Sequence, residues 1–163
     1  KITPQTSMWM AGYAARKKPS EGVALDLFAK ALVVEDKQGH RLVAITYDLI
    51  GVPRTFRTAV EQAVQAKYGV PPECLLIAAS HTHCGPELRA SRLDDDDIKA
   101  EFIPAAQKYM ERLQGQLVTL VGDALKRLAP AKLDFMRARC GFAMNRRRPV
   151  PTGYNNAPNS DGS

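Results

Sequence analysis

The hydrophobic positions in the first half of the chain fall into blocks that predict a β, β, α, β order of elements. Residues 23–34 and 42–49 are apolar and rich in β-branched side chains, and the turn-forming residues 36–39 separate them. This pattern predicts a β-hairpin. Residues 74–79 are a short apolar run that follows two prolines, which is typical of a strand buried on both faces.

Helical periodicity occurs twice along the chain. Over residues 53–68 apolar side chains recur at i, i+3, i+4, i+7 and i+8, Pro53 suits a first helical position, and Gly69 suits a helix C-cap. A second stripe, over residues 104–128, is the strongest periodicity in the chain. Because glycine disfavours helix, Gly115 predicts a bend or break within this second helix.

The remaining segments complete the predicted architecture. Residues 1–20 show no sustained period and predict a loop with one apolar anchor, residues 80–97 predict a second loop, and residues 133–138 alternate as a strand does. We therefore predict the α/β class, with a mixed β-sheet flanked by helices over residues 1–148. Residues 149–163 are rich in proline, glycine and asparagine and predict a loop or disordered tail.

The composition indicates which class of protein this is, but it says little about function. The 163 residues are 45% hydrophobic and 25% charged, which is typical of a globular domain and excludes disorder. The net charge of +6 decides little, and the longest apolar runs are far too short to span a bilayer. Because Lys1 is not followed by a leader pattern, we expect the numbering to begin after a removed leader or at an excision point. The cysteines have no CxxC spacing, so neither a disulfide framework nor a thiolate zinc knuckle is indicated; they are Cys74, Cys84 and Cys140.

The pair His81 and His83 is the centre of any metal or acid–base proposal, because the only other histidine, His40, lies in the predicted hairpin turn. The pair follows the predicted strand 74–79, and ligand crevices in α/β sheets lie beyond the carboxyl ends of strands. Residues i and i+2 of a strand point to the same side, so both imidazoles could face one cleft. Zinc needs three or four ligands, and a hydrogen-bonded or exposed pair remains the alternative. The other candidate ligands have no diagnostic spacing; they are Asp48, Cys84, Glu87 and residues 94–97.

Four sequence blocks resemble one protein family. Residues 80–86 read SHTHCGP and resemble the Gly-Thr-His-Thr-His-Ser-Gly-Pro signature of the neutral/alkaline non-lysosomal ceramidases. Residues 8–14 (MWMAGYA) are similar to the family's Met-Met-Gly-Tyr-Ala opening, and residues 44–49 (AITYDL) to its Val-Ser-Ala-Asp-Leu strand. Residues 145–158 resemble its Asn-Arg-Ser-Pro segment and the Asn-Pro that follows. Four blocks in the same order are far more specific than any one of them.

The resemblance implies a zinc amidohydrolase that cleaves the N-acyl bond of ceramide. By this resemblance His81 binds zinc, His83 acts in catalysis and contacts the substrate near its polar head, and Arg146 is the substrate-contacting arginine. Zinc would polarise the amide carbonyl and activate a bound water, while the imidazole and guanidinium would stabilise developing negative charge.

The resemblance also implies a setting for the reaction. It implies a lipid-like amide substrate, work at a membrane surface, and secretion or a periplasmic location. The family's other zinc ligands and its serine lie beyond the matched segment, so we expect this chain to be the amino-terminal part of a longer enzyme. The alternative is a catalytically incomplete binding or structural domain with the same fold. The family has a glycine before the first Thr-His step, where this chain has Ala79-Ser80, and glycines after the proline, where it has Glu87-Leu88. Another amide or an ester therefore remains open as substrate.

Several other residues have structural explanations beside functional ones. Asp48 either orients a ligand histidine or caps a loop. Residues 94–97 lack the spacing of a calcium loop, so we expect a solvated acidic loop. Cys84 is expected to line the pocket, because Cys-His catalysis joins groups that are near in space and adjacent residues rarely align. The arginines within residues 137–148 have no nucleic-acid motif around them, and we expect no nucleic-acid partner.

Overall fold

The structure is a computed structural model, and it forms two compact units, Lys1–Ala129 and Pro130–Ser163. It describes four stretches of the chain, residues 1–13, 15–94, 97–141 and 147–156.

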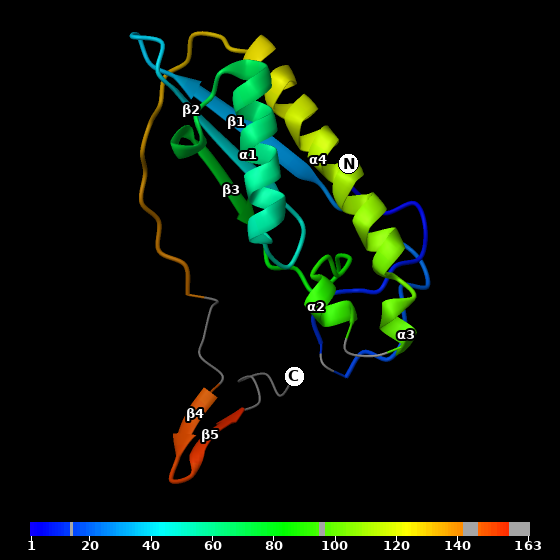
Figure 1. Cartoon of the computed structure of the whole chain (residues 1–163). Coiled ribbons are helices and arrows are strands. Elements are labelled where there is room, and N and C mark those ends of the chain that lie inside the picture. The colour runs from blue at the N-terminus through cyan, green and yellow to red at the C-terminus, as the bar shows by residue number, and fades with distance from the viewer. Residues whose placement is uncertain (14, 95–96, 142–146, 157–163) are drawn as a thin grey trace. The chain divides into compact units, whose positions relative to one another are not determined.

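The first unit is built on a mixed three-stranded sheet in the order β1-β2-β3 (Figure 1). Strands β1 (Ala29–Glu35) and β2 (Arg41–Tyr47) pair antiparallel, with Ala29 opposite Tyr47, so the predicted hairpin is confirmed. Strand β3 (Leu75–Ala79) pairs parallel with β2. The predicted α/β class with a mixed sheet and helices is therefore confirmed.

The hairpin turn is held by one carboxylate. Asp36 accepts hydrogen bonds from the backbone N–H groups of Gln38 and His40, and from the His40 ring at 2.9 Å. These bonds hold the pKa of Asp36 below its ordinary value. Gly39 has a φ of 85°, which a residue with a side chain adopts only at a cost.

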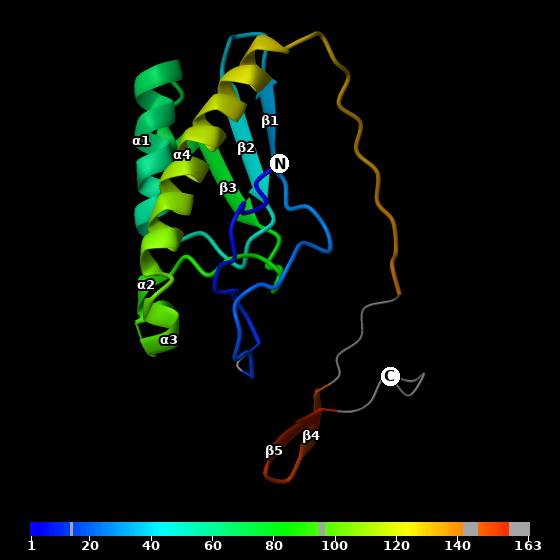
Figure 2. The same ribbon diagram turned by 90° about the vertical axis from the view of Figure 1, so that its right-hand side faces the viewer.

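Two long helices cover the same face of the sheet (Figure 2). Helix α1 (Arg54–Tyr68) ends at Gly69, whose φ of 67° confirms the predicted C-cap. Helix α4 (Ile103–Lys126) runs without interruption through Gly115, so the helix does not break there. The buried side chains of α4 on both sides of this glycine pack on one core, and that packing outweighs the weak helix propensity. No helix in the described part of the chain is long and apolar enough to span a membrane.

The core lies between the helices and the sheet. The helix-facing side chains of β2 are fully buried, as are the apolar stripes of both helices. Met8 and Trp9 of the N-terminal segment join the same cluster, so this segment is anchored by packing. The central members of the core are Val43, Ile45, Val60, Val64, Leu113, Leu117 and Val121.

Strand β3 is buried on one face, not on both as its sequence predicts. Leu76 is 59% exposed, because both long helices lie on the opposite face and β3 is an edge of the described sheet. Other apolar side chains on the strands are exposed too; they are Leu32, Val34 and Leu42.

The predicted loop over residues 80–97 contains a short helix. After β3 the chain is irregular as far as Arg89, and α2 (Ala90–Leu93) then forms a single turn that buries Leu93. A second single turn, α3 (Asp97–Ala100), precedes α4. These turns are too short to carry the periodicity from which helices are predicted.

The second unit contains a hairpin where the sequence predicts a loop or tail from residue 149. Strand β4 (Arg147–Val150) pairs antiparallel with β5 (Gly153–Asn156). Gly153, with a φ of 134°, closes the tight connection between the strands, and this local geometry outweighs the turn-rich composition. Residues 157–163 lie outside the described part, and the division into domains 1–148 and 149–163 stays a prediction.

Residues 133–138 do not form the predicted strand. Their alternation is real, but a strand needs a partner, and the described residues pair none with this segment. Leu133, Phe135 and Met136 are each almost nine-tenths exposed or more.

Candidate active site

The two predicted site histidines lie in the segment that follows the carboxyl end of β3. His81 has a φ of 59°, an uncommon conformation for a residue with a side chain. Its Nδ1 lies 2.8 Å from the carbonyl oxygen of Ile50. Since a carbonyl only accepts, Nδ1 carries the hydrogen and donates it, so in the neutral imidazole the lone pair is on Nε2. A backbone carbonyl on one ring nitrogen is how proteins orient a metal-binding histidine.

His83 is fixed by the N-terminal segment. Its ring packs edge-on against Tyr13 with centroids 4.9 Å apart, and it lies 5.2 Å from the His81 ring. The guanidinium of Arg16 donates from Nη2 to the His83 carbonyl oxygen at 2.9 Å. A Cβ on Gly12 would overlap the His83 ring, so only glycine fits beneath the imidazole.

Backbone pairing joins the N-terminal segment to the histidine loop. Met10 and Pro86 form an isolated antiparallel bridge, and the Ala11 N–H donates to the Gly85 carbonyl oxygen at 2.9 Å. A Cβ on Gly85 would lie 3.1 Å from the carbonyl oxygen of Asp48. Three of the four family-like blocks, at residues 8–14, 44–49 and 80–86, therefore meet at one place.

The described residues contain no group of three or more metal-binding side chains. Asp48 accepts a hydrogen bond from the Phe28 N–H at 2.9 Å, so its carboxylate caps the start of the β1 segment and bonds to no histidine. Glu87 is buried and binds Arg89 through both carboxylate oxygens. Cys84 is exposed and forms no pair with His83. The oriented Nε2 of His81 thus fits one ligand position, and the other candidate ligands do not join it.

Other predicted residues are not brought to the site in the described structure. Arg146 lies outside the described residues, as do Asp95 and Asp96. Asp94 is exposed after α2. The predictions for these residues stay predictions.

A cavity beside the histidine loop has a volume of about 600 Å³. Thr82, Cys84 and Asp48 line it, which agrees with a pocket-lining place for Cys84. Much of the remaining wall is residues 20–27, which the sequence marks only as a loop and the start of a strand.

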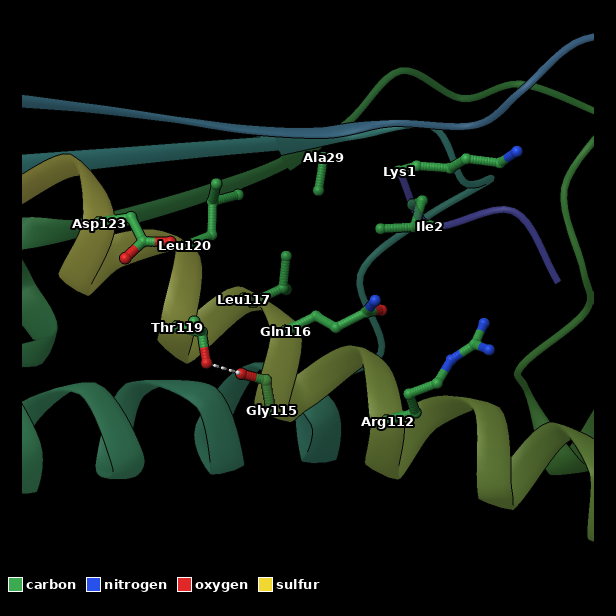
Figure 3. Close-up of a pocket in the computed structure, with 10 residues that line it drawn as sticks. All are labelled: Lys1, Ile2, Ala29, Arg112, Gly115, Gln116, Leu117, Thr119, Leu120 and Asp123. Carbon is green, nitrogen blue, oxygen red and sulfur yellow. Dashed lines mark hydrogen bonds between the residues drawn. The ribbon is translucent and has the colours of Figure 1, made fainter. Parts of the chain in front are cut away.

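A second cavity lies on α4 and does not touch the histidines. Its volume is about 540 Å³, and Figure 3 shows Lys1 and Arg112 at one end of it and Asp123 at the other. The same view shows the Thr119 hydroxyl donating to the Gly115 carbonyl oxygen, 2.9 Å away.

Sequence reasoning did not assign roles to Tyr13 and Arg16. Tyr13 lies in the family-like block MWMAGYA, and that block was the signal available. Arg16 carries no such signal, because its contact with His83 joins residues 67 positions apart.

The comparisons with known proteins agree with these convergent blocks. Residues 2–163 match the family described as neutral/alkaline non-lysosomal ceramidase, N-terminal. The chain belongs to this family.

The relatives are considerably longer than the chain. It is 31% identical to neutral ceramidase from Drosophila pseudoobscura pseudoobscura over 109 residues, which are 66% of this chain and 16% of that protein. It is 35% identical to neutral ceramidase from Pseudomonas aeruginosa over 80 residues, 47% of this chain and 12% of that protein. The crystal structure of the Pseudomonas aeruginosa neutral ceramidase matches 79% of this chain and 21% of its own, with a TM-score of 0.61 and 27% identity.

Proposed function

We propose that this chain is the amino-terminal part of a zinc-dependent amidohydrolase that cleaves the N-acyl bond of a ceramide-like lipid. The observation that carries the proposal is the hydrogen bond from His81 Nδ1 to the Ile50 carbonyl oxygen. This bond leaves Nε2 available to bind a metal. Family membership and the neutral ceramidases among the relatives support the substrate class.

Each site residue has a proposed task. Zinc, when bound, supplies Lewis-acid polarisation of the amide carbonyl and an activated water. His81 holds the metal through Nε2 and keeps its proton at Nδ1. His83, fixed by Tyr13 and Arg16, contacts the polar part of the substrate and stabilises developing negative charge. Arg146 is the proposed second substrate contact.

The setting of the reaction is also a proposal. A lipid-like amide substrate implies work at a membrane surface, in a secreted or periplasmic protein, without nucleic acid as partner. The remaining zinc ligands are proposed to come from residues other than those described, in keeping with the small fraction of each relative that the chain spans.

The first test is the zinc content of the natural gene product. We expect about one zinc per protein from this site, and its loss in His81→Asn, because the shorter amide cannot reach the Nε2 position. Asparagine tolerates positive φ, so the backbone at residue 81 is kept. The matched control is His40→Asn, in the exposed hairpin turn, which should keep its zinc. Equal zinc in wild type and His81→Asn would refute the metal assignment.

A catalytically incomplete binding or structural domain is the second candidate. It is favoured by the finding that the described residues offer no group of three metal-binding side chains. A folded natural product that contains no zinc and hydrolyses no lipid amide would support this candidate over the hydrolase.

A further inference from the structure

A third cavity, with a volume of about 340 Å³, is lined by Tyr13 and Arg16, which contact His83, and the proposed reaction does not use it. The N-terminal segment forms one wall, through Gly12 and Tyr13, and the chain around α2 forms the other. This volume falls in the range of small-molecule sites. Among the described residues, its charged lining groups are four cations and one carboxylate, Arg16, Arg89, Arg92, Lys99 and Glu87.

Arg16 is held in place by contacts within the protein, and not all of its hydrogen-bond donors have a partner among the described residues. One guanidinium nitrogen donates to the His83 carbonyl oxygen at 2.9 Å, and the group lies 5.6 Å from the centroid of the Tyr13 ring. Its Nε is buried and has no hydrogen-bond partner among the described residues. A buried N–H of a cation without an acceptor is costly. Arg16 also lines the cavity, so its guanidinium charge is available to an anion there.

Among the described residues, the one carboxylate of the wall does not neutralise the cavity. Glu87 is only 4% exposed, and the Arg89 guanidinium already binds it through two hydrogen bonds, of 2.7 and 2.5 Å. Among the described lining residues, the charge of Arg16 and of Arg92 is therefore left over. Lys99 is not counted in this excess, and its ammonium lies 5.7 Å from the centroid of the Trp9 ring. Of the neighbouring acidic run, Asp94 is exposed and does not line the cavity, and residues 95 and 96 lie outside the described part of the chain.

We propose that this cavity is a binding site for a phosphate-type oxyanion, with Arg16 as its fixed donor and Arg92 as a second cation at its mouth. A doubly charged phosphate matches an excess of more than one positive charge better than a single carboxylate does. The same chemistry is offered by free inorganic phosphate and by the headgroup of an anionic phospholipid. The site goes beyond the proposed hydrolysis, since it uses neither His81 nor a metal.

The test is a titration of the natural gene product with inorganic phosphate, at constant ionic strength set by chloride. We expect saturable binding that weakens about tenfold in Arg16→Gln, because a charge-assisted hydrogen bond is lost, and about threefold in Arg92→Gln, which is more exposed. Arg127→Gln is the matched control, since this exposed arginine follows the far end of α4, and it should bind phosphate as wild type does (Figure 1).

A second arm separates the two sources of phosphate. Vesicles of phosphatidylcholine alone are compared with vesicles that also contain phosphatidic acid. Stronger binding to the second kind, lost in Arg16→Gln, assigns the site to a lipid headgroup, while saturable binding of phosphate without such a preference assigns it to the free ion.

Three results would overturn the proposal. They are no phosphate binding together with no preference for phosphatidic acid, binding that both Arg16→Gln and Arg92→Gln leave unchanged, and binding lost in His81→Asn but kept in Arg16→Gln. The last result would place the phosphate on the metal. If the zinc tests contradicted the proposed hydrolase function, the phosphate site would not be affected. The two proposals can therefore be refuted separately.

Discussion

Gly12 is the residue on which the geometry of His83 most directly depends. Its φ of 77° already favours glycine, and a Cβ would overlap the imidazole. Gly39 has a similar φ of 85°, yet nothing lies within 4 Å of a Cβ there. A comparison of substitutions at these two glycines therefore distinguishes the cost of backbone strain from the effect of a contact with His83.

We expect Gly39→Ala to lower the free energy of unfolding by about 1 to 2 kcal/mol, the cost of positive φ for a residue with a Cβ. Gly12→Ala should add displacement of the His83 ring, and the proposed hydrolysis by the natural gene product should fall about a hundredfold, as misplaced site groups cause. Urea unfolding and amide hydrolysis measure the two effects. Equal activity of the two variants would contradict this role of Gly12.

Tyr109 gives the fold a dependence on alkaline pH. Its hydroxyl donates to the Ile2 carbonyl oxygen at 2.7 Å, and burial raises the pKa of Tyr109 to about 12. The pKa in the unfolded chain is about 10, so this contribution to stability is complete below about pH 10. It is lost as the pH rises towards 12, because the unfolded chain then releases the proton more readily.

We expect Tyr109→Phe to unfold at higher alkaline pH than wild type, since one of the groups that favour the unfolded state there is gone. At neutral pH the same variant should lose about 1 kcal/mol, the worth of its hydrogen bond. Circular dichroism followed against pH measures both. An unchanged alkaline midpoint would show that Tyr109 does not limit stability in this range.

At the scale of elements, the packing of α1 on α4 depends on Gly122. A Cβ there would overlap the Tyr68 hydroxyl, whereas nothing lies within 4 Å of a Cβ at Gly115 in the same helix. We expect Gly122→Ala to destabilise the protein by about 1 kcal/mol, because overpacking outweighs the gain in helix propensity.

Gly115→Ala is the matched variant and should stabilise by about 0.5 to 1 kcal/mol, since it relieves the entropic cost of glycine without a clash. Thermal or urea unfolding of both variants decides the point. A gain in stability for both would mean that Tyr68 moves aside without loss of packing.

The elements themselves were predictable where a long period or a turn marks them. Both long helices and the β1–β2 hairpin follow from apolar periodicity and from Gly69 and Asp36. The exposure of Leu76 was not predictable, because an apolar run does not say how many faces are covered. The segment 133–138 shows the same limit, since alternation does not supply a partner strand.

At the scale of the whole molecule, the position of the candidate site in the sheet was predictable from the sequence. The residues that hold its histidines in place were not. The position of His81 and His83 after β3 follows from the general geometry of α/β sheets. The carbonyl of Ile50 and the guanidinium of Arg16 are 31 and 67 positions from their histidine partners, and no local pattern encodes such contacts. Only the order of the family-like blocks pointed to their meeting.

The N-terminal segment has a consequence for how the site is kept in order. Holding the N-terminal segment against the histidine loop costs conformational entropy. Gly12 and Tyr13 themselves bury little surface. The compensating free energy comes from Ile2, Met8 and Trp9, which are buried in the core on the N-terminal side of these residues. The position of the His83 imidazole therefore depends on hydrophobic anchors elsewhere in the N-terminal segment.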